Sequence, residues 1–300
     1  MSVNYNGILA TGVSGFIGGH VWAALAERED VWGAYGSTGP VPLHPERQLP
    51  VDLSQPDSLS NVVRELKPRC IIHLAAMAGP AICQNQSLLA WQINNRAVRR
   101  MARAAAKLKA RVILASSDQV FDGSKGNYRE GDRPNPVNVY GETKKAAERS
   151  VFSTVENSVV ARFNNTYGSP KFGGSSFSEW ILGRVKAGER VILFKDQYRS
   201  PIDVTTLVNA LIELIDNPFQ GLLHLGGANR VNRLTFGRKL IEFTRGDLSL
   251  IAEAVSSDLD PQGFMPRDTS FDITLARQVL HTRLPGIEEG IRLVYDREEI

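Results

Sequence analysis

The segment "GILATGVSGFIGGH", residues 7–20, constrains the fold of this chain more than any other. A short apolar run ends at Thr11, and glycines follow at Gly12, Gly15 and Gly18 before a helix-like pattern begins. Glycines at this spacing permit a tight turn, a close approach of the backbone to a pyrophosphate, and close packing of the next helix. The free N–H groups of a helix N-terminus also attract phosphate. We therefore predict dinucleotide binding here, with a purely structural glycine turn as the alternative.

Apolar runs alternate with helical patterns through the first half of the chain. Strands without polar alternation are buried on both faces, as in a parallel sheet. Strand–helix alternation of this kind predicts an α/β fold with a doubly wound parallel sheet, the Rossmann architecture. The expected strands are 7–11, 31–35, 48–52, 70–75, 111–116 and 158–163, and the expected helices are 16–27, 56–66, 87–109 and 140–153.

The rhythm changes after residue 164, where the Gly-, Ser- and Asn-rich stretch 164–176 reads as a loop. We expect residues 1–164 to form the dinucleotide-binding domain and residues 165–300 to form a smaller α/β substrate-binding lobe. The boundary is soft, because a strand or helix from the second half could return to the large sheet. Its expected strands are 190–194 and 221–226, and its expected helices are 204–216 and 234–245.

Composition excludes several classes of protein. The 35 Lys and Arg against 32 Asp and Glu give a formal charge of +3. The densest basic run, 96–111, is predicted to be a solvated helix face, so no nucleic-acid partner is expected.

Two cysteines are too few for a disulfide scaffold and favour a reducing compartment. No apolar run of 18 residues and no charged leader occur, so we expect a cytoplasmic protein without a membrane partner. The five histidines lack the spacing of a zinc motif, so no metal is expected.

The end of the second expected strand bears on the choice of cofactor. A ribose 2′-hydroxyl usually pairs with an acidic residue there, but residues 31–45 contain no Asp or Glu. Small residues such as Ser37 could instead accept a 2′-phosphate, with Arg47 as a cationic partner. NADP(H) is therefore favoured, and NAD(H) is the alternative. Asp52, after the third strand, is placed to accept from an adenine amino group or else to cap the next helix.

A second motif follows the fifth expected strand. Ser117 lies where that strand ends, at the edge of the sheet where ligands bind. In "YGETK", Tyr140 and Lys144 share a helix face, and the ammonium should lower the pKa of the phenol. Such a tyrosine can exchange a proton with a carbinol oxygen that Ser117 also contacts, while Lys144 could hold the nicotinamide ribose. A tyrosine and lysine at this spacing occur by chance on many helices, so the order of the motifs carries the prediction.

The motifs together are those of a known family. They are "TGVSGFIG" (11–18), "VDLS" (51–54), "HLAA" (73–76), "SSDQVFDG" (116–123), "YGETK" (140–144) and "ARFNNTYG" (161–168). The chain resembles an extended short-chain dehydrogenase/reductase, and within that family it is most similar to the dTDP-4-dehydrorhamnose reductase branch. The resemblance implies a Rossmann domain, NAD(P)H and a nucleotide-sugar substrate with a 4-keto group. By family analogy the helices near 87–109 and 140–153 could pair across a homodimer, and the oligomeric state is left open.

The same resemblance implies roles for individual residues. It makes Ser117, Tyr140 and Lys144 catalytic. Arg199 falls where related enzymes hold a substrate diphosphate, and Asn94 where they order a water or a helix bend. Further substrate contacts are expected from Asp118, Gln119 and Asn164. Cofactor contacts are expected from Gly12, Ser14, Gly15, Phe16, Ile17, Gly18, Ser37, Asp52, Leu53, Ala75, Ala76 and Lys144.

Two other functions remain open at this point. One is an epimerase or dehydratase that keeps its nicotinamide bound, although the glutamate adjacent to an aspartate that is common in dehydratases is missing. The other is an NADP-binding regulatory subunit of a different enzyme. Gln119 and residues 77–86 depart from the branch pattern, so the sugar itself is left unassigned.

Overall fold

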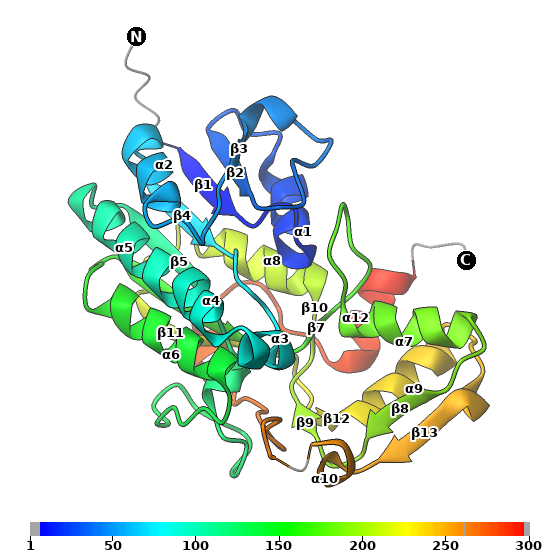
Figure 1. The fold of residues 1–300 in the computed structure, drawn as a ribbon. Coiled ribbons are helices and arrows are strands. Elements are labelled where there is room, and N and C mark those ends of the chain that lie inside the picture. The colour runs from blue at the N-terminus through cyan, green and yellow to red at the C-terminus, as the bar shows by residue number, and fades with distance from the viewer. Residues whose placement is uncertain (1–6, 261, 297–300) are drawn as a thin grey trace.

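Strand β1 (Ile8–Thr11) lies inside a seven-stranded sheet whose pairings are all parallel. In the computed structural model, which describes residues 7–260 and 262–296, the strand order is β11-β6-β5-β4-β1-β2-β3 (Figure 1). The other strands are β2 (Val31–Tyr35), β3 (Gln48–Pro50), β4 (Cys70–His73), β5 (Arg111–Ser117), β6 (Ser158–Phe163) and β11 (Gly221–Leu225). This confirms the predicted doubly wound α/β fold.

Helices cover both faces of the sheet, because apolar strand residues point alternately to each side. On one face α1 (Phe16–Leu25), α8 (Val204–Glu213) and α11 (Thr274–Val279) bury Trp22, Leu211 and their neighbours. On the other face α2 (Ser58–Leu66), α5 (Val98–Lys107) and α6 (Val139–Phe152) form a second core. The basic run predicted as a solvated helix belongs largely to α5, whose alanine stripe packs into this core.

The strand order places a crevice between β1 and β4. The chain steps outward from β1 to β2 and β3, and then returns to β4 on the opposite side of β1. Loops leaving the carboxyl ends of β1 and β4 therefore diverge, and ligands of open α/β sheets bind at such a switch point.

The second half of the chain contributes to two places. β11 lies at the edge of the large sheet beside β6, and α8 packs against α1. The rest forms a lobe around a third core that includes Ile181, Leu193 and Phe236 (Figure 1). This lobe holds α7 (Phe177–Lys186), β8 (Val191–Phe194), α9 (Arg233–Phe243), β13 (Ile251–Ala254) and α12 (Ile287–Tyr295), with β8 and β13 paired in parallel.

Shorter elements connect these layers. They are α3 (Pro80–Asn85), α4 (Ser87–Trp91), α10 (Ser256–Leu259), and the strand pairs β7 (Thr166–Tyr167) with β10 (Ile202–Asp203) and β9 (Tyr198–Arg199) with β12 (Val231–Asn232).

The single helix expected over 87–109 is not continuous in its geometry. A π-helical stretch, Gln92–Ala97, separates α4 from α5. Inside it, the Asn94 side chain accepts a hydrogen bond from Met77 N at 2.8 Å and donates to Met77 O at 3.0 Å and to Thr143 Oγ1 at 3.2 Å. The widened turn thus directs Asn94 into the segment after β4, and the motif periodicity alone did not reveal this.

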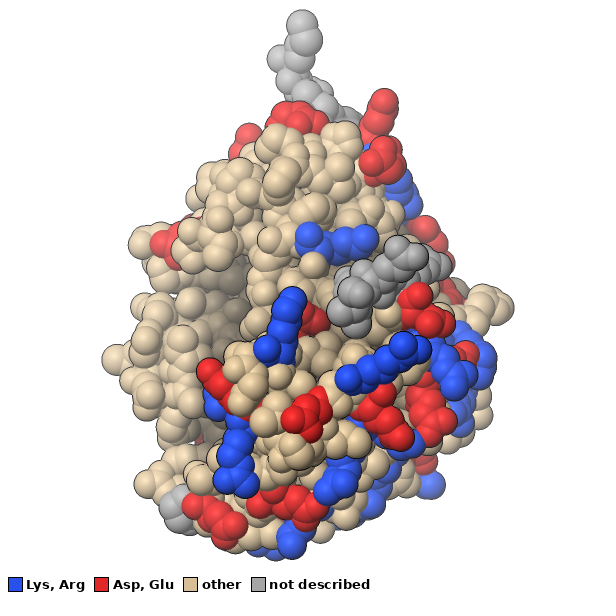
Figure 2. Space-filling view, turned by 90° about the vertical axis from the view of Figure 1, so that its right-hand side faces the viewer, with Lys and Arg blue, Asp and Glu red and all other residues tan. Residues whose placement is uncertain are grey.

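Surface charge is mixed on the face drawn in Figure 2, where Lys and Arg lie among Asp and Glu instead of forming a patch of one sign. Exposed ion pairs elsewhere in the described chain include Lys239–Glu288 and Arg238–Glu253. Within the described ranges, no helix combines the length and the apolar character needed to cross a bilayer. The same ranges contain no group of three or more His, Cys, Asp or Glu side chains arranged to hold a metal ion.

Candidate active site

A cleft of about 1310 Å³ opens beyond the carboxyl ends of the parallel strands. Apart from Arg47, every residue to which the sequence analysis assigned a cofactor, substrate or catalytic role lines this one cleft. They are Gly12, Ser14, Gly15, Phe16, Ile17, Gly18, Ser37, Asp52, Leu53, Ala75, Ala76, Ser117, Asp118, Gln119, Tyr140, Lys144, Asn164 and Arg199. Their individual roles remain predictions, but the fold brings them together.

The glycine turn has the geometry that its sequence requires. Gly12 has a φ of 76°, and a Cβ there would lie 2.9 Å from the backbone of Ala75 at the end of β4. A Cβ on Gly18 would lie 1.9 Å from Gly12 O. Gly15 immediately precedes α1, whose first residue is Phe16. The turn therefore presents a helix N-terminus to the cleft, with no side chain between the backbone and a bound phosphate.

The end of the cleft beside β2 is lined by hydroxyl groups. Thr38 Oγ1 donates a hydrogen bond to Ser14 Oγ at 2.7 Å, and Ser37 lies beside them. Asp52 also lines this end, although its carboxylate already accepts from Ser54 N at 2.9 Å and Ser54 Oγ at 2.7 Å. These bonds form a local turn and do not cap α2, whose N-cap residue is Asp57, so the alternative of Asp52 as the cap of the next helix is wrong.

Arg47 is not the cationic partner that the sequence suggested. Its guanidinium donates to the backbone carbonyls of Arg28 and Ala26 near the end of α1, and it lies 6.0 Å from the Trp22 ring. These contacts hold it behind α1, outside the set of residues that line the cleft.

Ser117, Tyr140 and Lys144 meet at the end of β5. The Ser117 hydroxyl donates a hydrogen bond to Asp118 Oδ1 at 3.0 Å, and it lies close enough to the Tyr140 phenol to lower the pKa of that phenol. Lys144 Nζ donates to Ala115 O at 2.5 Å, so the lysine is tied to the same strand. Asn138 caps α6 by accepting from Gly141 N, which sets where the helix begins and hence where Tyr140 points.

The protonation states of this group follow from burial. Burial raises the pKa of Tyr140 above its ordinary value, the Asp118 carboxylate raises it further, and the Ser117 hydrogen bond lowers it. This direction is opposite to the one expected from a neighbouring ammonium, because burial disfavours the phenolate. Burial also lowers the pKa of Lys144 to about 8, although the Glu148 carboxylate acts to raise it. Tyr140 is therefore a protonated phenol at neutral pH, the form that can donate a proton.

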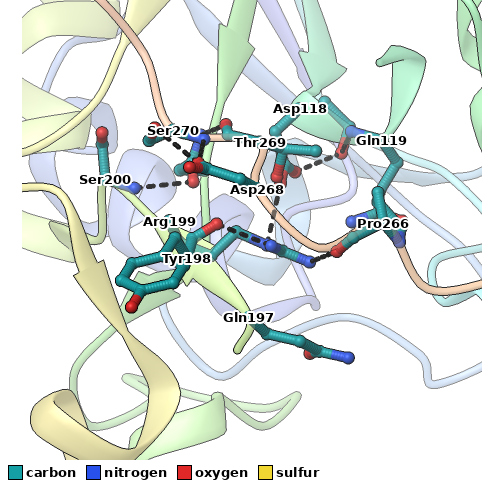
Figure 3. A network of polar contacts seen from close by, with 12 residues as sticks. Asp118, Gln119, Gln197, Tyr198, Arg199, Ser200, Pro266, Asp268, Thr269 and Ser270 are labelled. Atoms are coloured by element: carbon teal, nitrogen blue, oxygen red, sulfur yellow. Dashed lines mark hydrogen bonds and ion pairs between the residues drawn. The ribbon is translucent and has the colours of Figure 1, made fainter. Parts of the chain in front are cut away.

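Asp118 and Arg199 form a buried ion pair beside the site (Figure 3). Arg199 Nε lies 3.2 Å from Asp118 Oδ2, and the remaining contacts of the guanidinium are to the carbonyls of Tyr198, Pro266 and Arg267. Asp118 also accepts from Thr269 Oγ1. Both charges are thus held mainly by the protein, which does not support the expected role of Arg199 as the principal ligand of a substrate diphosphate.

Arg233, at the start of α9, is the cation that the motif analysis missed. It lines the cleft, its guanidinium carbon lies 4.8 Å from the centre of the Phe177 ring, and its buried Nε makes no hydrogen bond within the described chain. Burial and the charge of Arg199 lower its pKa to about 9, against Asp118, which raises it. Of the described residues that line the cleft, only Lys144, Arg199 and Arg233 are cationic.

Gln119 and Asn164 line the cleft but also have structural partners. Gln119 Oε1 accepts from Asn138 Nδ2 at 3.1 Å. Asn164 accepts from Ser200 N at 2.9 Å and donates to Thr269 O at 3.0 Å. These contacts hold the β6 end, β9 and the segment after Arg267 against one another, so any substrate contact must use the remaining hydrogen-bonding capacity.

A family model, described as the RmlD substrate binding domain, matches residues 6–300. The chain belongs to this family. The match spans both the sheet and the lobe, and it confirms the resemblance to the dTDP-4-dehydrorhamnose reductase branch.

The proteins to which the chain is similar have different descriptions. The chain is 29% identical over 290 residues to a probable low-salt glycan biosynthesis reductase of Haloferax volcanii, covering 94% of each chain. It is also 29% identical over 231 residues to methionine adenosyltransferase 2 subunit beta of Xenopus laevis, covering 75% of this chain and 68% of the relative. A dTDP-4-dehydrorhamnose reductase of Bacillus anthracis, solved in complex with NADP, is 23% identical with a TM-score of 0.87, over 98% of this chain and 99% of that one. The last likeness shows the shared fold.

Two buried groups near the cleft, His73 and Cys83, have structural roles. His73 Nδ1 lies 2.9 Å from Thr11 Oγ1, and burial lowers the pKa of His73 to about 3. The Cys83 thiol donates to Met77 O at 3.2 Å, and burial raises its pKa. A neutral imidazole and a protonated thiol are poor nucleophiles, so neither group competes with Tyr140 for a chemical role.

Proposed function

We propose that this protein is an NAD(P)H-dependent reductase of a keto group on a nucleotide-linked sugar, similar in chemistry to dTDP-4-dehydrorhamnose reductase. The observation that carries this proposal is the convergence of Ser117, Tyr140 and Lys144 on one cleft with the glycine turn of β1. A phenol kept protonated by burial is suited to the direction of reduction, in which the former ketone oxygen must gain a proton.

Tyr140, Ser117 and Lys144 have separate roles in the proposed reaction. Tyr140 delivers the proton, and Ser117 hydrogen-bonds the same oxygen as negative charge develops on it. Lys144 holds the neighbouring ribose and supplies a positive charge beside the phenol. The bound nicotinamide supplies the hydride, and this chain supplies its binding site and its orientation.

The residues present fit a dinucleotide. A Cβ on Gly12 would lie 2.9 Å from the Ala75 backbone and one on Gly18 would lie 1.9 Å from Gly12 O, so only glycine permits this turn beside the half-buried start of α1. The hydroxyls of Ser14, Ser37 and Thr38, without a carboxylate between residues 31 and 45, favour NADP(H) over NAD(H). The NADP complex of the Bacillus anthracis reductase supports this choice, whereas the displacement of Arg47 weakens it.

The substrate is proposed to be anionic. Arg233 stacks against Phe177 at the lobe side of the cleft, and it forms no ion pair with any carboxylate of the described residues. A guanidinium in this setting suits a diphosphate, which can accept several of its N–H donors. The sugar would then extend from Arg233 toward Tyr140, with Gln119 beside it.

A regulatory role is the second candidate, because the relative from Xenopus laevis is a subunit of another enzyme. An epimerase or dehydratase with retained nicotinamide is a third reading. The complete Ser117, Tyr140 and Lys144 set argues for a catalyst over a purely binding subunit. We also propose a homodimer in the cytoplasm, where the free thiols of Cys70 and Cys83 would remain reduced.

One experiment separates these candidates. Purified protein is screened for thermal stabilisation by NADPH and NADH, each crossed with dTDP-, UDP- and GDP-linked sugars. NADPH oxidation is then followed with dTDP-4-keto-6-deoxysugar. Net NADPH consumption supports the reductase. Bound nicotinamide without net consumption supports an epimerase or dehydratase, and binding without turnover across the whole panel supports a regulatory subunit. Gel filtration with light scattering tests the homodimer.

A further inference from the structure

Helix α6 is fastened to the end of β5 at two points, one helical turn apart. Lys144 Nζ donates to Ala115 O, and Ser116 Oγ donates to Glu148 Oε1, each at 2.5 Å. Residues four apart on a helix share a face, so both anchors and Tyr140 point toward the strand. Ser117 follows directly in the chain. The distance between Tyr140 and Ser117 is therefore set by how these two anchors hold the helix on the strand.

Glu148 is itself held rigidly by a buried ion pair. Arg162, on β6, donates through Nε at 2.8 Å and through Nη2 at 2.6 Å, a two-pronged contact with both side chains 5% exposed or less. The Arg162 guanidinium also lies 5.0 Å from the Phe121 ring and 3.4 Å from His224 Nε2. Glu148 therefore has three donors and almost no freedom to rotate. The two N–H donors of Arg162 make this a buried ion pair and not an isolated buried carboxyl group.

The charge of Glu148 acts on Lys144. The titratable groups that face Lys144 are Glu148 on α6, Cys83 on α3 and His73 on β4, with Tyr140 one turn earlier on α6. His73 has a pKa of about 3 and Cys83 a raised pKa, so both are uncharged at neutral pH. Glu148 is thus the carboxylate that offsets the burial of Lys144, and without it burial would favour a neutral amine.

We propose that Glu148 is a positioning residue of the reductase site, which keeps Lys144 charged and, through Ser116, fixes the strand end that carries Ser117. This inference rests on the proposed function in that Lys144 and Ser117 are taken to serve the reaction. The motif around Tyr140 and Lys144 gives Glu148 no such role. Its effect requires no contact with substrate or cofactor.

The charge role is tested first without any enzymatic assay. In lysine-labelled protein, the ¹³Cε signal of Lys144, assigned by its loss in Lys144→Arg, is followed against pH in wild type and in Glu148→Gln. We expect the midpoint of Lys144 to fall by roughly one pH unit or more, the size expected for loss of a neighbouring opposite charge. An unchanged midpoint overturns the charge role. A shifted midpoint in a protein that reduces no keto sugar counts against the proposed function and leaves this inference standing.

The positioning role is tested by kinetics. Ser116→Ala removes one anchor and leaves the Glu148–Arg162 pair intact. We expect kcat to fall roughly two- to tenfold, the equivalent of one hydrogen bond, with the KM for NADPH unchanged. Glu148→Asp keeps the negative charge but has a shorter side chain, so it should lower kcat. The fall of kcat at alkaline pH, here called the alkaline limb of the pH profile, should occur at the same pH as in wild type. In Glu148→Gln the alkaline limb should move to lower pH.

The control is Arg149→Gln, an exposed neighbour on the same helix, which should leave both kcat and the pH profile unchanged. If Glu148→Gln does not fold because Arg162 is left unpaired, Ser116→Ala and Glu148→Asp carry the test. Wild-type kcat in Ser116→Ala together with an alkaline limb in Glu148→Asp that has moved would overturn the proposal.

Discussion

Arg199 Nε lies 3.2 Å from Asp118 Oδ2, and both side chains are buried below the cleft. Asp118 is the carboxylate whose charge raises the pKa of Arg233, and Asp118 is already paired with Arg199. Asp260, which also lines the cleft, accepts from the backbone N–H groups of Phe264 and Met265. The Arg233 guanidinium, stacked against the Phe177 ring, thus forms no ion pair among the described residues. A partly buried cation in this state gains most from an anionic ligand.

Arg233→Gln should therefore weaken the binding of dTDP or UDP by roughly 10- to 100-fold, the range for loss of charge-assisted hydrogen bonds. Isothermal titration with the free nucleotide diphosphates measures this without a keto sugar, and NADPH affinity should be unchanged. Arg238→Gln is the matched control, because Arg238 lies on the same helix, is exposed and pairs with Glu253. Equal nucleotide affinity in the two variants would exclude Arg233 as the anion ligand.

Tyr140→Phe should lower kcat by roughly 10²–10⁴-fold, the range for loss of a general acid, and should leave NADPH affinity close to wild type. The measurement is steady-state NADPH oxidation together with fluorescence titration of the cofactor. Tyr128→Phe is the control, since that hydroxyl bonds Asp122 at 2.7 Å and lies outside the residues that line the cleft. Undiminished turnover in Tyr140→Phe would remove Tyr140 from the reaction.

Gly18→Ala should damage both stability and cofactor binding. Its Cβ would lie 1.9 Å from Gly12 O, and that backbone oxygen can yield only if the turn moves. We expect a loss of about 1–3 kcal/mol in the free energy of unfolding, typical of overpacking. Gly183→Ala in α7 is the control, because a Cβ there meets nothing within 4 Å and alanine favours the helix. Urea unfolding and NADPH titration compare the two variants.

Buried neutral histidines should make the protein less stable in mild acid. His73 and His224 have pKa values lowered by burial to about 3, against an ordinary value of 6.5. Below pH 6.5 these histidines bind protons in the unfolded chain but not in the folded chain. The contribution of the two neutral histidines to the free energy of unfolding is therefore complete above pH 6.5 and is lost as the pH falls toward 3. Each histidine should contribute a slope of about 1.4 kcal/mol per pH unit.

Urea unfolding between pH 7.5 and pH 5 tests this, because the carboxylates with lowered pKa values titrate below that window. His224→Gln should reduce the slope by the share of one histidine. His281→Gln should leave it unchanged, since His281 is exposed. A slope that is the same in all three proteins would contradict the assignment.

Much of the fold could be predicted because its causes are local. The glycine triplet, the apolar strands and the Tyr140–Lys144 spacing each lie within one turn or one strand, where spacing alone predicts geometry. The family match and the seven-stranded sheet confirm the recognition and the fold class. The roles of the individual site residues remain predictions, although all of them except Arg47 and Asn94 line one cleft.

Spacing could not predict how a side chain is used once it is buried. Arg47 lies near Ser37 in the sequence, yet its guanidinium finds the carbonyls of Arg28 and Ala26, which end α1. Arg199 fits a motif but is engaged by Asp118 and three carbonyls, while Arg233 fits none and faces the cleft. The pKa of Tyr140 rises because burial and the Asp118 carboxylate both raise it and outweigh the Ser117 hydrogen bond.

The sequence by itself determined a glycine turn for a dinucleotide, a parallel sheet, and a tyrosine and lysine on one helix face. These depend on backbone sterics and on periodicity, which act over a few residues. Only the tertiary structure decided that β11 joins the large sheet and that Glu148 meets Ser116 and Arg162. It also decided that Arg233 forms no ion pair within the part of the chain that the structure describes. Those outcomes depend on which distant charges and carbonyls burial brings within hydrogen-bonding distance.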